Sequence, residues 1–127
     1  GLTDRGNIAP VRTISGANTG LNDPNGIAVD TINNEVFAAS YGNNSITVYG
    51  RTESGNIAPL RTISGANTGL SNPKGIAVET INNQIFVANY GNNSITVYSR
   101  TDSGNIVPVR TISDTSTSST STGLSYP

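Results

Sequence analysis

Two Asn-Asn-Ser triplets, which begin at Asn43 and Asn92, match the spacing of a known covalent modification. An Asn placed two residues before Ser or Thr is the acceptor for an N-linked glycan in secreted proteins. The same residues are also favourable in a tight turn between two strands. Both interpretations remain open, and Asn43 and Asn92 are therefore candidate N-glycosylation sites.

A tract of Ser and Thr near the end of the chain offers hydroxyl groups in an unbroken row. Such tracts carry O-linked glycans in stalk-like segments. They also serve as flexible linkers, because they are too polar to pack into a core. The candidate O-glycosylation sites are Thr115, Ser116, Thr117, Ser118, Ser119, Thr120, Ser121 and Thr122.

Carboxylates are the remaining candidate ligands for a cation. Calcium requires several oxygen ligands that converge within one loop, whereas the acidic residues here stand singly. We therefore predict no metal site and no cofactor, and we expect Asp30 and Glu79 to cap the turns that follow them. The residues considered were Asp23, Asp30, Glu35, Glu79 and Asp102.

Arginine and tyrosine recur at equivalent places, as Arg12, Arg61 and Arg110, and as Tyr49 and Tyr98. One interpretation is a ladder of ligand-binding side chains. The other is a set of cross-strand pairs on the outer part of a sheet, with each Arg stacked on the neighbouring ring. The second interpretation needs no ligand, and it is the one that we predict.

Composition narrows the possible chemistry. The chain has no Cys and no His, so it lacks a thiolate nucleophile and an imidazole base, and we predict that it is not an enzyme. Seven basic and eight acidic residues give a net charge of -1, without the basic stripe of a nucleic-acid-binding protein. No apolar run approaches the roughly 20 residues that span a bilayer. A surface rich in Asn, Thr and Ser favours an extracellular or cell-surface location.

The chain repeats itself with a period of 49 residues. The stretch from Gly6 to Ser54 aligns without a gap on Gly55 to Ser103, and 38 of the 49 positions are identical. A third copy opens at Gly104 and then enters the Ser/Thr tract. Periods of this size are typical of repeat proteins, in which one unit cannot bury its apolar faces without neighbours.

Each repeat predicts four strands and no helix. In the first repeat they lie near Ile27–Asp30, Glu35–Ser40, Ser45–Tyr49 and Leu60–Ser64, separated by turns rich in Asn and Gly. The first two strands are apolar at nearly every residue, so we expect them to be covered on both faces. The third and fourth alternate, and we expect them nearer the solvent. We predict four-stranded antiparallel meanders of the kind that form β-propeller blades.

Two motifs resemble known propeller repeats. Leu70-x-x-Pro73-x-Gly75-Ile76-Ala77-Val78, and its copy beginning at Leu21, resemble the opening strand of NHL repeats. The segments 85–89 and 92–98 (IFVAN and NNSITVY) are similar to the YVTN, lactonase-like repeats. This resemblance implies a propeller fold. Propellers of these families include binding proteins, scaffolds and enzymes, but the chain lacks the channel-mouth constellation of the lactonase-like enzymes, so no catalytic residue is implied.

The repeat boundaries predict two complete blades with partial ones on either side. A closed propeller needs roughly four to eight blades, so we expect further blades of the same chain, or other copies of it, to complete a larger propeller or array. The segment Val11 to Ser15 would then be an orphan fourth strand that closes a neighbour's incomplete blade. The predicted divisions are 1–25 (end of a preceding blade, with its outer strand), 26–64 (blade), 65–74 (inter-blade loop), 75–113 (blade) and 114–127 (Ser/Thr-rich linker).

Three functions fit these features. The first is a non-catalytic extracellular module with a structural or interaction role, assembled with neighbouring blades or copies as a ring or a fibre. The second is a propeller that binds glycans or peptides, with one equivalent site in each blade. The third is a fragment of a lactonase-like hydrolase whose active residues lie elsewhere. Under any of them we expect Ile14, Phe37, Phe86 and Ile112 to be buried between neighbouring sheets.

Overall fold

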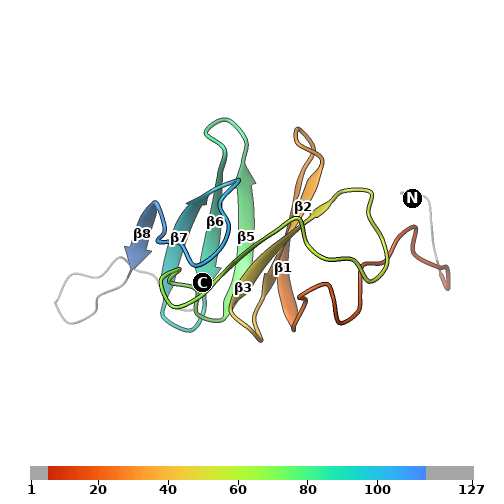
Figure 1. Ribbon diagram of the computed structural model, residues 1–127, viewed down its shortest axis with the longest axis horizontal. Coiled ribbons are helices and arrows are strands. Elements are labelled where there is room, and N and C mark those ends of the chain that lie inside the picture. The colour runs from red at the N-terminus through yellow and green to blue at the C-terminus, as the bar shows by residue number, and fades with distance from the viewer. Residues whose placement is uncertain (1–5, 114–127) are drawn as a thin grey trace.

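The computed structural model describes residues 6–113, which form two antiparallel four-stranded sheets and no helix. Each sheet runs in chain order, β1-β2-β3-β4 and β5-β6-β7-β8, and the two stand side by side (Figure 1). The predicted all-β meander is confirmed. We call the first sheet blade 1 and the second blade 2. The strands are β1 (Pro24–Asp30), β2 (Glu35–Ser40), β3 (Ser45–Gly50), β4 (Arg61–Ser64), β5 (Pro73–Glu79), β6 (Gln84–Asn89), β7 (Ser94–Ser99) and β8 (Arg110–Ser113).

Asparagines close the hairpin turns. Asn34 and Asn83 adopt φ values of 58° and 56° between the first and second strands of each blade, and Asn44 and Asn93 adopt 52° and 54° at the next turn. Asn tolerates this left-handed conformation better than most residues because its short side chain bonds to the local backbone. The turns therefore fix the strand lengths, and both blades share the same register.

Strand pairing sorts the side chains of each blade onto two faces, because successive residues of a strand point to opposite sides. The leading face of blade 1 points away from blade 2, and the trailing face points toward it. In blade 1 the leading face carries Ile27, Val29, Val36, Ala38, Ser40, Thr47 and Tyr49, and the trailing face carries Gly26, Ala28, Phe37, Ala39, Ile46, Val48, Arg61 and Ile63. The same faces recur in blade 2 at positions 49 residues later.

The core lies between the blades. It joins the trailing face of blade 1 to the leading face of blade 2, and we call this contact the internal joint. Phe37, Ile46 and Ile63 on one side meet Ile85 and Tyr98 on the other, and each is at most 1% exposed. The largest group of buried apolar side chains thus lies between one blade and the next, as expected of a repeat protein.

The expected gradient of burial across the strands is wrong. In blade 1, Ile27 and Val29 of the first strand are 69% and 53% exposed, whereas the third strand is buried from Ser45 to Tyr49. The first strand lies at one edge of its sheet, and no described element covers its leading face. Alternation in the third strand misled the prediction, because its polar residues are buried with hydrogen bonds.

Glycine allows the first strands of the two blades to approach closely. A Cβ atom added to Gly26 would overlap the carbonyl oxygen of Lys74 and lie 3.2 Å from the Cα atom of Gly75. A Cβ added to Gly75 would meet only the Cβ of Ala88, at an ordinary 3.6 Å. The backbones of the two first strands thus crowd together at Gly26, where a following blade exists in the described chain.

The segment from Val11 to Ser15 forms no strand in the described structure, contrary to the prediction for the orphan fourth strand. It makes a single bridge, from Ile14 to Gly55 of blade 1. Both blades already have four strands, so neither is the incomplete blade that this segment was predicted to close. Residues 114–127, with all the candidate O-glycosylation sites, lie outside the described residues.

Candidate interaction surface

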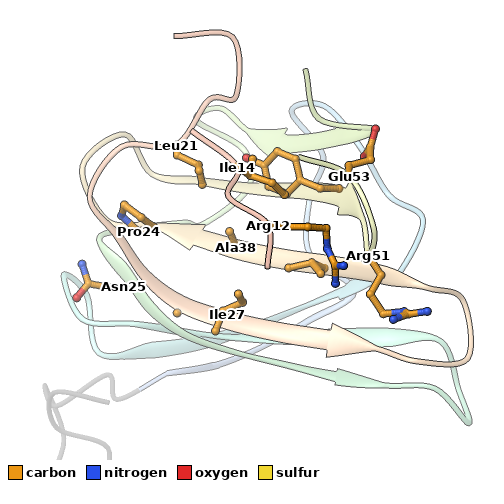
Figure 2. A pocket seen from close by; sticks show the side chains of 12 residues that line it. Arg12, Ile14, Leu21, Pro24, Asn25, Ile27, Ala38, Arg51 and Glu53 are labelled. Atoms are coloured by element: carbon orange, nitrogen blue, oxygen red, sulfur yellow. The ribbon is translucent and has the colours of Figure 1, made fainter. Parts of the chain in front are cut away.

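The leading face of blade 1 forms an open pocket of about 470 Å³. Ile27 and Ala38 lie on the two strands that form its floor. Ile14 and Leu21 lie over it, in the part of the chain that precedes β1, which we call the incoming segment (Figure 2). Arg12 and Arg51 lie together at one end of the pocket. An apolar floor rimmed by a few charged groups is typical of a surface that contacts another molecule.

Smaller side chains help to hollow this face. Blade 1 has Val36, Ala38 and Ser40 where blade 2 has Ile85, Val87 and Asn89, and the other leading-face positions are identical. The equivalent face of blade 2 is filled by the trailing face of blade 1. The pocket is therefore the leading half of a blade-to-blade joint, and no part of residues 6–113 supplies the other half.

The trailing face of blade 2 is the complementary surface. The eight trailing-face residues named above recur unchanged in blade 2, and Glu35, which lies on the same face, is replaced by Gln84. Ile112 is 47% exposed, whereas the equivalent Ile63 is 1% exposed, and Phe86 is half-buried where Phe37 is fully buried. A shallow apolar pocket lined by Phe86, Ala88 and Ile95 marks this face. Of the four residues expected to be buried, only Phe37 is fully so.

A charged cluster joins the blades at one end of the internal joint. The Arg61 guanidinium donates to the two carboxylate oxygens of Glu35 at 2.7 and 3.0 Å. Arg100 of blade 2 donates to Glu35 Oε1 at 3.2 Å and lies 3.9 Å from Asp30 Oδ2. The bonds from Arg61 lower the pKa of Glu35 and outweigh the opposing effect of burial, and Arg100 acts in the same direction. One carboxylate thus holds two arginines from two blades.

Blade 2 carries a neutral version of this cluster. Gln84 replaces Glu35 and accepts a hydrogen bond from Arg110 at 2.8 Å. Arg51 of blade 1 is the equivalent of Arg100, and its Nε atom donates to the side-chain oxygen of Asn34 at 3.1 Å. Arg51 meets no carboxylate of a preceding blade among residues 6–113.

A backbone clip attaches the fourth strand of one blade to the loop of the next. Gly104 N donates to Thr62 O at 2.7 Å, and Ser64 N donates to Gly104 O at 3.2 Å. Asn105 completes the clip, because its side-chain oxygen accepts from the backbone N–H of Asn67 at 2.8 Å. The sequence alone did not reveal this role of the Gly-Asn-Ile motif, although its recurrence in all three repeats was the available signal.

The same clip holds the incoming segment on blade 1. Gly55 bonds to Thr13 and Ser15 at 2.7 and 3.2 Å, and Asn56 accepts from Asn18 at 2.8 Å. The distances match those of the clip between the blades. Residues 13–18 therefore lie on blade 1 in the same way that β4 and the loop after it lie on blade 2.

The candidate N-glycosylation sites lie at equivalent exposed turns. Asn43 donates to the carbonyl oxygen of Gly20 at 3.2 Å and accepts from the Ser45 hydroxyl at 2.7 Å. Asn92 makes the same pair of bonds, at 3.5 Å to Gly69 and 2.6 Å from Ser94. Both amides thus stabilise their turns, and both side chains lie at the surface.

The predicted caps at the turns are confirmed. Asp30 accepts from the backbone N–H groups of Ile32 and Asn33 at 2.9 and 3.0 Å, and Glu79 accepts from that of Asn82 at 2.8 Å. Burial raises the pKa of Asp30, but the hydrogen bonds from Asn33 and Ile32 outweigh it, and the pKa is lowered from its ordinary value. Within residues 6–113, no group of three acidic side chains converges as a metal site would require.

The predicted stacking of Arg on Tyr is wrong, because the two lie on opposite faces of the blade. Arg61 and Arg110 instead lie over Phe37 and Phe86, each 6.0 Å from the ring centre. Tyr49 and Tyr98 point the other way. Their hydroxyls donate to Thr19 O and Thr68 O at 2.7 and 2.6 Å and also bond to Thr47 and Thr96. Burial raises the pKa of both tyrosines, so they serve as buried neutral hydrogen-bonding groups.

Comparison with known proteins supports the fold and leaves the NHL and YVTN resemblance without further support. No protein-family model and no curated protein matches the chain. A structure titled as hydrazine synthase of Kuenenia stuttgartiensis is similar, with a TM-score of 0.55 and 21% identity over 82% of this chain and 25% of that one. A structure titled as a nidogen/laminin complex gives 0.50 and 22%, over 62% and 28%.

The chain therefore spans about a quarter of the length of these structures. Both are propeller-type neighbours of an all-β chain, and the likeness concerns the fold alone. No helix of the described residues is long and apolar enough to cross a membrane. Sheet order, the shared register and the face-to-face packing lead to one conclusion: residues 6–113 contain two consecutive blades of the β-propeller type.

Proposed function

We propose that this chain is a non-catalytic, extracellular β-propeller module with a structural or interaction role. Its blades are completed by neighbouring blades, from its own chain or from other copies, in a ring or a fibre. The observation that carries this proposal is the pair Ile63 and Ile112. They occupy the same place on the fourth strand of two nearly identical faces, yet one is buried and the other is half-exposed.

Burial of apolar side chains is the driving force for such contacts. Fully burying an Ile or Val side chain contributes roughly 1.5–3 kcal/mol. Ile27 and Val29 on one face and Ile112 on the other are largely or half-exposed, and covering them would contribute roughly 2–5 kcal/mol in proportion to that exposure, a substantial part of the about 5–15 kcal/mol that stabilises a small domain. This supports an assembling role for both outer faces.

Near-identity of the two blades supports a structural role over a catalytic one. An active site needs side chains that differ from blade to blade, and 38 of 49 positions are the same here. The extracellular location is supported by the accessible turns that carry Asn43 and Asn92 and by the low content of charged residues, 12%.

Light scattering across a dilution series tests the assembly. We expect a mass above that of one chain, 13.1 kDa, that falls on dilution. A stable, soluble monomer with a cooperative melt would contradict the proposal. Turnover of lactone substrates by the purified chain would instead favour the hydrolase alternative, and saturable binding of one glycan or peptide per blade would favour a binding propeller.

A further inference from the structure

The segment Val11–Ser15 is held on blade 1 along one edge by backbone hydrogen bonds to Gly55, and its other edge is open among the described residues. In β4 the backbone groups of Thr62 and Ser64 face the clip, and those of Arg61 and Ile63 face β3. The equivalent groups of Thr13 and Ser15 bond to Gly55. Those of Arg12 and Ile14 have no backbone partner in the part of the chain that the structure describes. The free edge is the one that a third strand of another blade would pair with.

Strand β8 has the same sequence as this segment. Residues 11–15 and 109–113 both read Val-Arg-Thr-Ile-Ser. β8 is also loosely covered, because Arg110, Thr111 and Ile112 are exposed where the residues of β4 are partly or fully buried. Replacing β8 by residues 11–15 on the edge of β7 would therefore leave the strand pairing and its side chains unchanged.

The free energy that favours this exchange comes from filling the pocket above the leading face of blade 1. In the internal joint the corresponding space is filled by Phe37, Ala39, Ile46 and Val48. The same four residues recur on the trailing face of blade 2 as Phe86, Ala88, Ile95 and Val97. A second copy that presents this trailing face would fill the pocket with the residue types that already fit the repeat.

We propose that residues 11–15 of one copy replace β8 on β7 of a second copy, and that the chains thereby join head to tail. The two segments cannot occupy β7 together, because the clip holds residues 11–15 in the place where β8 would lie in such a joint. β8 must therefore be released. This inference rests on the proposed function and names its partner: a second copy of this chain.

The joint between copies is weaker than the internal joint. The leading face of blade 1 is smaller at Val36, Ala38 and Ser40, so the contact leaves unfilled space. Arg51 would meet Gln84 where Arg100 meets Glu35, so one charged bond is lost. Both differences make the assembly reversible on dilution.

Matched lysine substitutions test which strand is used, with association measured by sedimentation velocity over a dilution series. Ile14→Lys and Ile112→Lys place the same change in identical five-residue sequences. We expect Ile14→Lys, and Ile27→Lys on the leading face, to raise the dissociation constant at least tenfold. Ile112→Lys should leave it unchanged or lower it, because β8 leaves the sheet. Ile81→Lys, at a turn residue that is 89% exposed, is the control and should have no effect.

The opposite pattern overturns the inference. If Ile112→Lys abolishes association and Ile14→Lys does not, β8 stays in place and the faces dock without exchange. If none of these substitutions changes an association that the chain does show, the copies touch elsewhere, and only the inference fails. A chain that stays monomeric throughout contradicts the inference and the proposed assembly together.

A disulfide provides a direct measurement of strand register. Thr96 pairs with Thr111 in the present sheet, and residue 13 takes the place of residue 111 after exchange. At such a non-hydrogen-bonded pair the Cα atoms are about 4.5 Å apart, within the range of a disulfide. Because the chain has no cysteine, we expect a mixture of Thr13→Cys and Thr96→Cys chains to form mixed dimers under mild oxidation. Equal yields of mixed and like dimers would contradict the exchange.

Discussion

Glu35 and Arg61 are the first residues of β2 and β4, which are not neighbours in blade 1, and their side chains form an ion pair with two hydrogen bonds of 2.7 and 3.0 Å. Arg100 of blade 2 joins the same carboxylate, so the pair belongs to the joint between the blades as much as to one sheet. The equivalent residue in blade 2 is Gln84, which serves as a reference for an amide at this position when Glu35 is substituted.

Replacing Glu35 by Gln should destabilise the fold. The amide can accept from one arginine, as Gln84 accepts from Arg110, but it leaves the partly buried Arg61 without a counter-charge and Arg100 with Asp30 alone, 3.9 Å away. We expect the free energy of unfolding to fall by about 1.5–3 kcal/mol, the range for hydrogen bonds to charged groups. Urea denaturation measures it, and a loss below about 0.5 kcal/mol would contradict this role for Glu35.

Acid should destabilise the fold through Glu35 and Asp30. Both have pKa values below their ordinary 4.5 and 3.8 in the folded state, so the unfolded chain binds protons first as the pH falls. Their contribution is present above these ordinary values and is lost as the pH drops through the lowered ones. Melting temperatures measured from pH 7 to pH 2 should therefore decline below about pH 4.5. The decline should be shallower in Glu35→Gln, and an equally steep decline would assign the acid sensitivity to other groups.

Gly65 and Gly104 should differ in their tolerance of alanine. Both have positive φ, 124° and 84°, which costs a non-glycine residue about 1 kcal/mol or more. A Cβ at Gly65 would also overlap the side chain of Asn105, whereas a Cβ at Gly104 would meet nothing within 4 Å. We expect Gly65→Ala to lower the free energy of unfolding by about 2–4 kcal/mol, because strain is added to a broken clip. In thermal melts, Gly104→Ala should lose less stability than Gly65→Ala. Equal losses of stability would contradict a stabilising role for the clip.

Expression in a secretory host with glycosylation machinery should modify Asn43 and Asn92 together. The two side chains make the same hydrogen bonds at equivalent exposed turns, so an enzyme that accepts one should accept the other. Intact-mass analysis measures the occupancy, and Ser45→Ala should remove one glycan only. A glycan on a single turn of the unsubstituted chain would contradict the equivalence, and bare residues at both sites would leave the Asn residues with their turn-forming role alone.

The strands and turns of this protein follow from local sequence. A β-branched and aromatic run such as Gln84–Asn89 between Asn-rich turns leaves little choice but a strand, and the 49-residue period repeats the outcome. The caps formed by Asp30 and Glu79 were predictable for the same reason, because each bonds to backbone groups only two or three residues away. Local chemistry thus determined the meander of each blade.

Burial and side-chain partners were decided only by the tertiary structure. Ile63 and Ile112 each stand in the sequence Arg-Thr-Ile-Ser and hold the same strand position, yet they are 1% and 47% exposed. The difference depends on whether another blade lies against that face, which no local pattern records. Arg61 was assigned to the wrong ring for a related reason: strand pairing puts it on the face of Phe37, and Tyr49 points to the other side. The sequence by itself determined the blade, and the contact between blades determined which of its faces became core and which stayed open to a partner.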